Sequence, residues 1–336
     1  MSNDKLMDIC QEAIEQIVKR LREEGKSDDE ILDKVKKIDY TKMIRDASQV
    51  SSEITVEYFK SHMYEIAYEE RLKTDEFLAH QNLIWGRCFA TSQAMYVMAV
   101  EAAEIYCEFV TNDLTDEEII PKQFKFLALQ HMQARACQEF LEILYLMRFG
   151  FADGAYARWR SMYELCCCAQ FISTQDEQIA KQYVEQSQTE NQKYTWTKGA
   201  KDKDGNELKI STFNKIQELA NENDVLNDAW KKQYKLACFV THASPQGTFK
   251  RLANGPKTNA IPVGHSDYGI TTAAEHSAIA LQWITSILLS VYRNLEAISI
   301  IKAMSEWVEV IRDYYFTTAK EEFSEKTDIE EKKDGT

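Results

Sequence analysis

Glycine and proline are scarce in this sequence, with 11 and 4 residues among 336. Both shares lie below the roughly 7% and 5% of an average protein. All-β folds need many tight turns and therefore many residues of these two types, whereas helix interiors tolerate few of either. Hydrophobic residues make up 44% of the chain, which is enough for a substantial core. The composition therefore predicts an all-α fold, a multi-helix bundle with long helices.

Common catalytic and metal-binding signatures are also missing. The sequence contains no Gly-x-Gly-x-x-Gly, no Gly-x-Ser-x-Gly and no His-Glu-x-x-His motif. Gly25-Lys26-Ser27 lacks the upstream glycine of a phosphate-binding loop, because position 20 is an arginine. None of the six histidines follows a glutamate by three residues, which is the ligand spacing of di-iron helical bundles. We therefore expect no metal and no cofactor.

The sequence shows no sign of export or of membrane insertion. Its first residues, MSNDKLMDIC, lack the basic start and apolar run of a signal peptide. The longest apolar run, 277–292, has 16 residues, fewer than the roughly 18 to 20 of a spanning helix. The eight cysteines include no Cys-x-x-Cys pair, and the consecutive Cys166, Cys167 and Cys168 would point about 100° apart on a helix. We expect a cytoplasmic protein with reduced, buried thiols and no membrane partner.

The chain is expected to have three parts. A helical hairpin over 1–40 comes first, with one helix that ends at Gly25 and a second that a Ser27–Glu30 capping box opens. A main helical domain over 41–318 and a charged flexible tail over 319–336 follow. The hairpin is either a surface for a protein partner or a homo-oligomer, or a solvated extension, and both interpretations stay open.

The main domain is expected to contain long helices and one irregular segment. A Thr115–Glu118 capping box predicts a helix over 116–149, and Thr174 with Glu177 predicts one that runs to about residue 198. Residues 201–207 should form a turn. The irregular segment, 241–268, contains three of the four prolines, and a loop of this length is more often functional than not. One or two long helices are expected over 41–112, and the other helices at 154–173, 212–222, 226–240 and 270–317.

A local excess of positive charge is the strongest functional signal. Residues 229–266 contain no Asp or Glu, although the chain carries a net charge of −14. Such a stretch can attract phosphate-bearing ligands, or it can pair with the acidic helices of the protein itself or with an acidic partner. We leave the two interpretations open. The six cations of the stretch are Lys231, Lys232, Lys235, Lys250, Arg251 and Lys257.

A candidate acid or base lies within this basic stretch. His242 belongs to a polar segment, THASPQG, directly after the apolar end of a predicted helix, and its side chain can titrate near neutral pH. Ser244 adds a hydroxyl group, and Lys250 and Arg251 add positive potential. A lone histidine is more often a structural residue, and this alternative remains open.

A second candidate group lies on the predicted helix over 154–173. Arg160 and Glu164 are four residues apart and therefore share a helix face, whereas Arg158 should point in another direction. Trp159, Leu165 and the neighbouring cysteines suggest that the pair is at least partly buried. The pair is either a structural ion pair or a guanidinium that Glu164 holds in place for a phosphate or carboxylate group.

Two segments resemble an uncharacterised bacterial family that is known only as a domain of unknown function. They are 150–183, with its Ala-x-x-x-Trp-Arg-Ser-x-Tyr-Glu core, and YKLACFVTHASPQG over 234–247. The resemblance spans about residues 80–315 and implies an all-helical fold in which Arg160, Glu164 and His242 approach one another. It carries no established activity.

A more remote similarity is to HEPN-type ribonucleases, helical enzymes of toxin and phage-defence systems. These place a histidine on the same helix as an arginine, after four to six intervening residues. No such motif occurs here, so Arg160 and His242 would have to meet from separate helices.

Two functions are therefore considered. In the first, the protein binds, and in one version cleaves, a phosphate-bearing ligand such as RNA or a nucleotide, in a bacterial defence or stress system. Arg160 binds the anion, Glu164 orients Arg160, His242 is the acid or base, and Arg158, Ser244, Lys250 and Arg251 assist binding. Cleavage would be a metal-independent, ribonuclease-like hydrolysis. In the second, the chain is a non-catalytic helical module that binds another protein.

Overall fold

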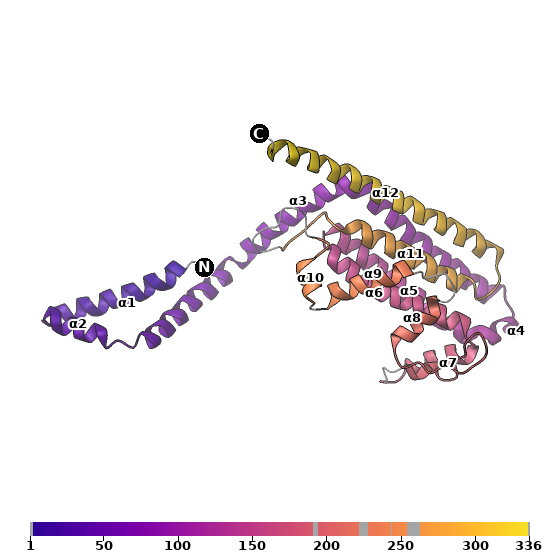
Figure 1. The fold of residues 1–336 in the computed structure, drawn as a ribbon, viewed down its shortest axis with the longest axis horizontal. Helices are drawn as coiled ribbons and strands as arrows, with labels where there is room; N and C mark the ends of the chain where they lie inside the picture. Colours follow the sequence, from indigo (N-terminus) through magenta and orange to yellow (C-terminus); the bar gives the residue numbers. More distant parts are fainter. Residues whose placement is uncertain (1–2, 191–193, 222–227, 243, 254–262, 335–336) are drawn as a thin grey trace. The chain divides into compact units, whose positions relative to one another are not determined.

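The computed structural model describes residues 3–190, 194–221, 228–242, 244–253 and 263–334. These residues form α-helices, two short 3-10 helices and the connections between them, with no strand (Figure 1). The predicted all-α fold is therefore confirmed. The chain separates into two compact units, Met1–Lys73 (unit 1) and Thr74–Thr336 (unit 2).

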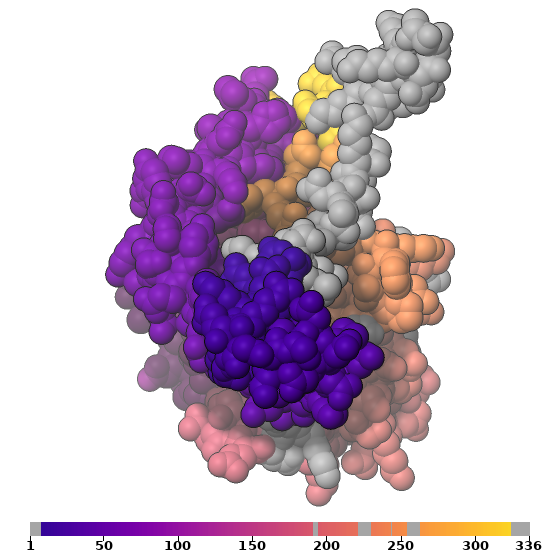
Figure 2. Space-filling view, turned by 90° about the vertical axis from the view of Figure 1, so that its left-hand side faces the viewer, coloured from indigo at the N-terminus to yellow at the C-terminus, as the bar shows by residue number. Residues whose placement is uncertain are grey.

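Unit 1 contains the first two helices and the first part of the third. Helix α1 covers Asn3–Glu23, α2 covers Asp28–Lys36, and the 73-residue α3 begins at Tyr40. The indigo surface in Figure 2 belongs to α1 and α2. The predicted capping box is present, because the Ser27 N–H donates to Glu30 Oε2 at 3.0 Å and Ser27 Oγ accepts from the Glu30 N–H at 3.4 Å.

In unit 2, α3 continues to Asn112 and the next predicted helix is divided. The Thr115–Glu118 capping box forms, but the helix that it opens, α4 (Asp116–Ile119), has four residues. A 3-10 turn, Ile120–Lys122, follows, and α5 covers Gln123–Arg148. The prediction of one helix over 116–149 was wrong because Pro121 has no N–H for an α-helical hydrogen bond.

The next two helices are α6 (Ala152–Thr174) and α7 (Glu177–Gln186). Thr174 is the last residue of α6, so the predicted cap was wrong, and Asp176 takes the N-cap position of α7. α7 ends well before residue 198. Gln186 Oε1 accepts hydrogen bonds from the Thr195 hydroxyl and the Trp196 N–H at 2.7 and 2.8 Å, and these bonds stabilise the separate 3-10 turn Tyr194–Thr197. Residues 201–207 form the predicted turn, with a bridge between its two ends.

The basic stretch contains more helix than predicted. Helices α8 (Phe213–Asn221) and α9 (Asp228–Thr241) lie near their expected positions. A short helix, α10 (Pro245–Phe249), forms within the segment that we expected to be irregular. Residues 254–262 of that segment lie outside the described residues, and Lys257 is among them.

The predicted helix over 270–317 is two helices, α11 (Ile270–Leu289) and α12 (Leu295–Asp334). The break contains no glycine or proline. Instead, the Tyr106 hydroxyl accepts a hydrogen bond from the Tyr292 N–H at 2.7 Å and donates one to the Tyr292 carbonyl at 2.9 Å. The Lys122 ammonium donates to the Val291 carbonyl at 2.8 Å. The break is therefore stabilised by partners from α3 and the α4–α5 connection, which helical periodicity cannot reveal. α12 includes most of the predicted tail.

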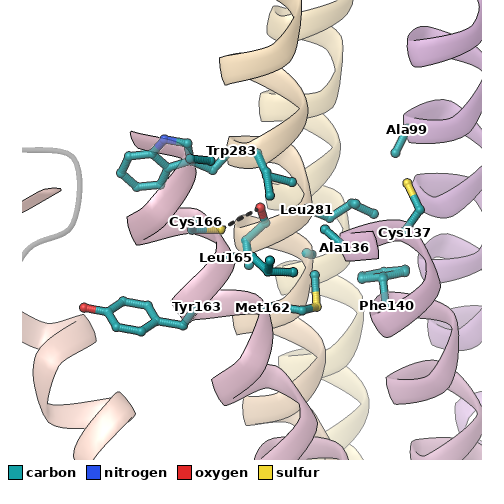
Figure 3. Close-up of a cluster of buried hydrophobic side chains, with 14 of the residues drawn as sticks. Ala99, Ala136, Cys137, Phe140, Met162, Tyr163, Leu165, Cys166, Leu281 and Trp283 are labelled. Carbon is teal, nitrogen blue, oxygen red and sulfur yellow. Dashed lines mark hydrogen bonds between the residues drawn. The ribbon is translucent and has the colours of Figure 1, made fainter. Parts of the chain in front are cut away.

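The core of unit 2 surrounds α11, which contacts α5, α6 and α12. Fourteen of the 20 residues of α11 are buried, so the apolar run over 277–292 belongs mostly to a core helix, as predicted. Figure 3 shows Leu281 of α11 close to side chains of α5 and α6, with the Cys166 thiol donating to the Ala280 carbonyl at 3.3 Å. None of the described helices is both long enough and apolar enough to cross a membrane.

Candidate functional site

The predicted Arg160–Glu164 pair forms on α6 and extends to α9. The Arg160 Nη2 atom lies 2.9 Å from Glu164 Oε1, and the two side chains are 24% and 36% exposed. The Tyr234 hydroxyl of α9 donates to the same Glu164 oxygen at 2.8 Å. The Arg160 guanidinium lies 5.6 Å from the centre of the Tyr234 ring, within the range of a cation–π contact. The three side chains therefore form one half-buried polar network between α6 and α9.

The protonation states of this network favour a fixed arrangement. Burial lowers the pKa of the Arg160 guanidinium, but Tyr234 and the Glu164 carboxylate together raise it by more, so Arg160 stays charged. Burial, followed by the hydrogen bond to Glu164, raises the pKa of Tyr234, so its hydroxyl keeps the proton that it donates. Arg160 Nε is buried and has no hydrogen-bond partner among the described residues. The guanidinium therefore keeps unused donor capacity.

Arg158 faces the opposite side of α6, as its spacing predicted. Its Nε atom lies 2.5 Å from Glu142 Oε2, and its Nη2 atom lies 3.7 Å from Glu139 Oε1, with both carboxylates on α5. Arg158 is thus held between two carboxylates in the α5–α6 interface. A ligand-binding role for Arg158 beside Arg160 stays a prediction.

Glu139 is a charged residue that the sequence analysis did not select. Its side chain is fully buried, and its Oε1 atom accepts hydrogen bonds from Arg135 Nε at 3.0 Å and from the Ser161 hydroxyl at 2.9 Å. Its Oε2 atom has no hydrogen-bond partner among the described residues. The four-residue spacing of Arg135 and Glu139 was the one available sequence signal. It is also the commonest arrangement of exposed helical pairs, so it did not indicate burial.

His242 lies just after the last turn of α9 and its side chain is exposed. Its N–H donates to the Cys238 carbonyl at 3.0 Å. Eight residues separate His242 from Tyr234, which corresponds to about 12 Å along a helix axis. The described contacts join Arg160 to Glu164 and Tyr234, and none of them includes the His242 side chain. Approach of His242 to the network therefore stays a prediction.

The Ser244 hydroxyl is engaged in local structure. It is the N-cap of α10, where Ser244 Oγ accepts from the Gly247 N–H at 2.9 Å and donates to the Phe239 carbonyl at 3.0 Å. A side chain at Gly247 would overlap the Phe239 carbonyl, so the close approach of α9 and α10 requires glycine here. These bonds show what Ser244 does in the fold, and its contact with a ligand stays a prediction.

The basic residues divide into paired and unpaired groups. Arg251 Nε lies 3.4 Å from Asp153 Oδ2 at the start of α6. Asp153 also accepts hydrogen bonds from the Leu252 and Ala253 N–H groups at 2.8 and 3.2 Å. By contrast, Lys232, Lys235 and Lys250 are exposed, and none of them forms an ion pair with a residue that the structure describes.

The second histidine of the basic stretch has a structural position. His265 Nδ1 lies 2.7 Å from the Phe149 carbonyl, and Nε2 lies 3.2 Å from the Thr74 hydroxyl. Its ring stacks on Phe77, with 4.9 Å between the ring centres. These contacts fix the end of the basic stretch against α3 and the end of α5.

All eight cysteines are free thiols. Burial raises the pKa of Cys137 and of Cys168 to about 12, and it raises the pKa of Cys166 and Cys167 as well, so these thiols are protonated at neutral pH. Within the described part of the chain, no three His, Cys, Asp or Glu side chains gather closely enough to hold a metal ion.

The model of a family of unknown function, DUF5677, matches residues 126–259. This region includes most of α5 and all of α6 to α10, and therefore the Arg160–Glu164–Tyr234 network and His242. No curated protein and no solved structure matches the chain. The family resemblance expected from the sequence is thus supported over residues 126–259, and no finding supports a similarity to HEPN-type ribonucleases.

Proposed function

We propose that the surface of α9 and α10 binds a phosphate-bearing ligand, with short RNA or a nucleotide as the ligand class. The observation that carries the proposal is the presence of three exposed lysines, Lys232, Lys235 and Lys250, without ion-pair partners among the described residues of a chain of net charge −14. If the stretch served only to neutralise acidic helices, these ammonium groups should have carboxylate partners. Unpaired lysines instead leave a local positive potential that attracts phosphate groups.

Arg160 is the anchoring residue in this proposal. Glu164 and Tyr234 hold its guanidinium between α6 and α9, so little side-chain entropy remains to be lost when an anion binds. The Arg160 side chain is 24% exposed, so a phosphate group can reach the guanidinium from solvent. Glu164 neutralises part of the charge, so Lys232, Lys235 and Lys250 must supply the net attraction.

Cleavage is the catalytic version of the same proposal. His242 would then be the acid or base, in an enzyme that needs no metal, and Arg160 would stabilise charge on the phosphate group. The proposed role in bacterial defence or stress is suggested only by the family resemblances. Without cleavage, the chain is a recognition protein.

The binding test measures fluorescence anisotropy of a labelled single-stranded RNA and of a labelled nucleotide at several salt concentrations. Replacing Lys232, Lys235 and Lys250 by alanine should weaken RNA binding. It should also make the plot of log association constant against log salt concentration less steep by about 2, because each of the three lost phosphate contacts contributes roughly 0.7 to the slope. The matched control replaces three other exposed lysines of unit 2, Lys198, Lys209 and Lys320, and keeps the same net charge. The proposed site would be rejected if both triple variants lost the same binding affinity, or if neither RNA nor the nucleotide bound to the wild-type protein.

The cleavage test uses the same RNA and measures product length on a gel. His242→Gln should abolish cleavage and leave RNA binding within about twofold of wild type, whereas Arg160→Ala should weaken both. If the wild-type protein binds RNA without shortening it, the catalytic version is wrong. If it binds neither RNA nor nucleotide, the non-catalytic interaction module is the better interpretation of the chain.

A further inference from the structure

An apolar groove runs between α1 and the first part of α3 in unit 1. It encloses about 410 Å³, and its floor is formed by apolar residues at helical spacing on both helices. Three of them, at steps of four residues, come from α1, and three come from α3. They are Ile9, Ala13 and Ile17 on α1, and Met43, Ala47 and Val50 on α3.

Unit 1 has little core of its own. Among its described residues, the buried apolar side chains are Leu21, Ile31 and Ala47. Burial of one such side chain contributes roughly 1.5–3 kcal/mol, whereas ordering each residue costs about 1–2 kcal/mol in backbone entropy. Three buried side chains therefore cannot stabilise two helices and a long helical segment. Additional apolar surface must be covered for unit 1 to be stable.

The apolar face of the groove continues along α3. From Val50, which lines the groove, the face continues through Ile54, Tyr68 and Leu72, at steps of 4, 14 and 4 residues. Steps of this size return to the same side of an α-helix. All four are about half exposed. The 21 residues of α1 span about 31 Å, whereas the 34 residues of α3 in unit 1 span about 51 Å, at 1.5 Å per residue. α1 is therefore too short to cover the whole face.

We propose that a second copy of this chain covers the groove, so that two α1 helices and two α3 segments form a four-helix bundle around a twofold axis. Two helices with an open apolar seam are half of such a bundle, and pairing with an identical half closes both seams at once. The twofold axis requires each surface to be complementary to itself. The charges beside the groove meet this requirement.

Both signs of charge alternate along the edges of the groove. Lys42 of α3 lies between Asp39, directly before the helix, and Asp46, and all three line the groove. A second copy brings the same mixture and can place opposite charges together. A strongly acidic or basic partner would instead face like charges along each edge, which is unfavourable.

The available area also fits a dimer. A half-exposed large apolar side chain offers about 100 Å². Val50, Ile54, Tyr64, Tyr68 and Leu72 therefore provide about 500 Å² per copy, and the partly exposed Ile9, Ile17 and Met43 add to this area. Each partner contributes about 800 Å² to a stable protein interface of ordinary size, so these apolar side chains supply most of the required area.

The first test measures the mass of the full chain by size-exclusion chromatography with light scattering and by sedimentation equilibrium. The wild-type protein should have twice its monomer mass of 38.9 kDa. Val50→Glu with Ile54→Glu places charges in the interface and should raise the dimer dissociation constant at least 100-fold. The control, Ser48→Glu with Ser52→Glu, adds the same charge to the opposite face of α3 and should leave the dimer intact. A wild-type monomer at 100 µM, or a dimer insensitive to the groove substitutions, would overturn the proposal.

The second test needs no substitution and therefore does not depend on how the variants fold. Hydrogen exchange of the wild-type protein is compared at about 50 µM and about 0.5 µM. Dilution should speed exchange in α1 and over residues 43–54 of α3, because dissociation uncovers the groove, and should leave α11 unchanged. Exchange rates in α1 that do not depend on concentration would contradict the dimer. Neither test involves the lysines of α9, so failure here leaves the anion-binding proposal unaffected.

Discussion

Unit 1 and unit 2 are both helical, but they bury their apolar side chains to very different extents. The described part of unit 1 buries Leu21, Ile31 and Ala47, whereas the largest fully buried side chains, including Trp85, Trp159 and Phe140, all belong to unit 2. Half-exposed tyrosines and aliphatic residues instead line much of α3 in unit 1.

The difference shows that amphipathic helices do not form a core until each apolar stripe has a neighbour. In unit 2, α11 is apolar on most sides and contacts α5, α6 and α12. In unit 1, a groove stays open between α1 and α3. We therefore expect the stability of unit 2 to come from its own packing, and that of unit 1 to depend on association.

The largest effect should follow a cavity in the core of unit 2. Phe140 of α5 is 1% exposed, so Phe140→Ala should reduce the free energy of unfolding by about 3–5 kcal/mol, measured by urea denaturation with circular dichroism. The matched substitution in unit 1, Leu21→Ala, should leave the main unfolding midpoint nearly unchanged. Equal shifts of that midpoint in the two variants would show that the units unfold together and would break the comparison.

Charged side chains sharpen the comparison between buried and exposed contacts. Glu139 is fully buried and accepts hydrogen bonds from Arg135 and Ser161, so Glu139→Gln should cost about 1.5–3 kcal/mol of unfolding free energy. Glu142 also pairs with Arg158, but it is 38% exposed, and solvent screening should limit the cost of Glu142→Gln to below about 1 kcal/mol. Urea denaturation measures both, and a larger cost for Glu142 would contradict the assignment of Glu139 as the central acceptor.

The sequence was sufficient for the fold class and for most helix positions, because those depend on local composition and capping. The Ser27 and Thr115 capping boxes form as predicted. The end of α11 could not be predicted, because the Tyr106 hydroxyl that satisfies the backbone of Tyr292 comes from a helix 186 residues away. Pro121, in contrast, was a local signal that should have divided the predicted helix.

The candidate site shows the same limit. Four-residue spacing predicted the contact between Arg160 and Glu164, and the contact is present. The third member, Tyr234, lies 70 residues beyond Glu164 and joins the pair only because α9 packs on α6. Charge counting found the basic stretch, but it could not tell that Asp153 would pair with Arg251 and that Lys250 would have no ion-pair partner in the described part of the chain.

A buried histidine gives unit 2 a pH dependence that unit 1 should lack. His276 of α11 contacts the rings of Trp159 and Trp230, and burial lowers its pKa below the ordinary 6.5, although the adjacent Glu275 carboxylate opposes this shift. Arg312, which pairs with Glu275 at 2.7 Å, lowers the pKa further.

Below about pH 6.5, the unfolded chain therefore takes up a proton that the folded chain binds less readily, and stability is lost as the pH falls. Between pH 7.5 and 5.5, the Tm of the wild-type protein should fall by more than that of His276→Gln. The control, His131→Gln, changes an exposed histidine of α5 and should keep the wild-type pH dependence. If the Tm of His276→Gln fell with pH as much as the Tm of the wild-type protein, His276 would not be the source of the pH dependence.

The smallest expected effect is local to unit 1. Ser27→Ala removes the N-cap hydroxyl of α2. Loss of such a cap usually costs about 1 kcal/mol, so the amides of α2 should exchange with solvent about fivefold faster. Ser48→Ala, an exposed change in the interior of α3, should leave exchange in α2 unaltered. The main unfolding midpoint should not move in either variant, since unit 2 supplies it. A shift of that midpoint with Ser27→Ala would mean that α2 contributes to the stability of the larger unit, and the two cores could no longer be treated as separate.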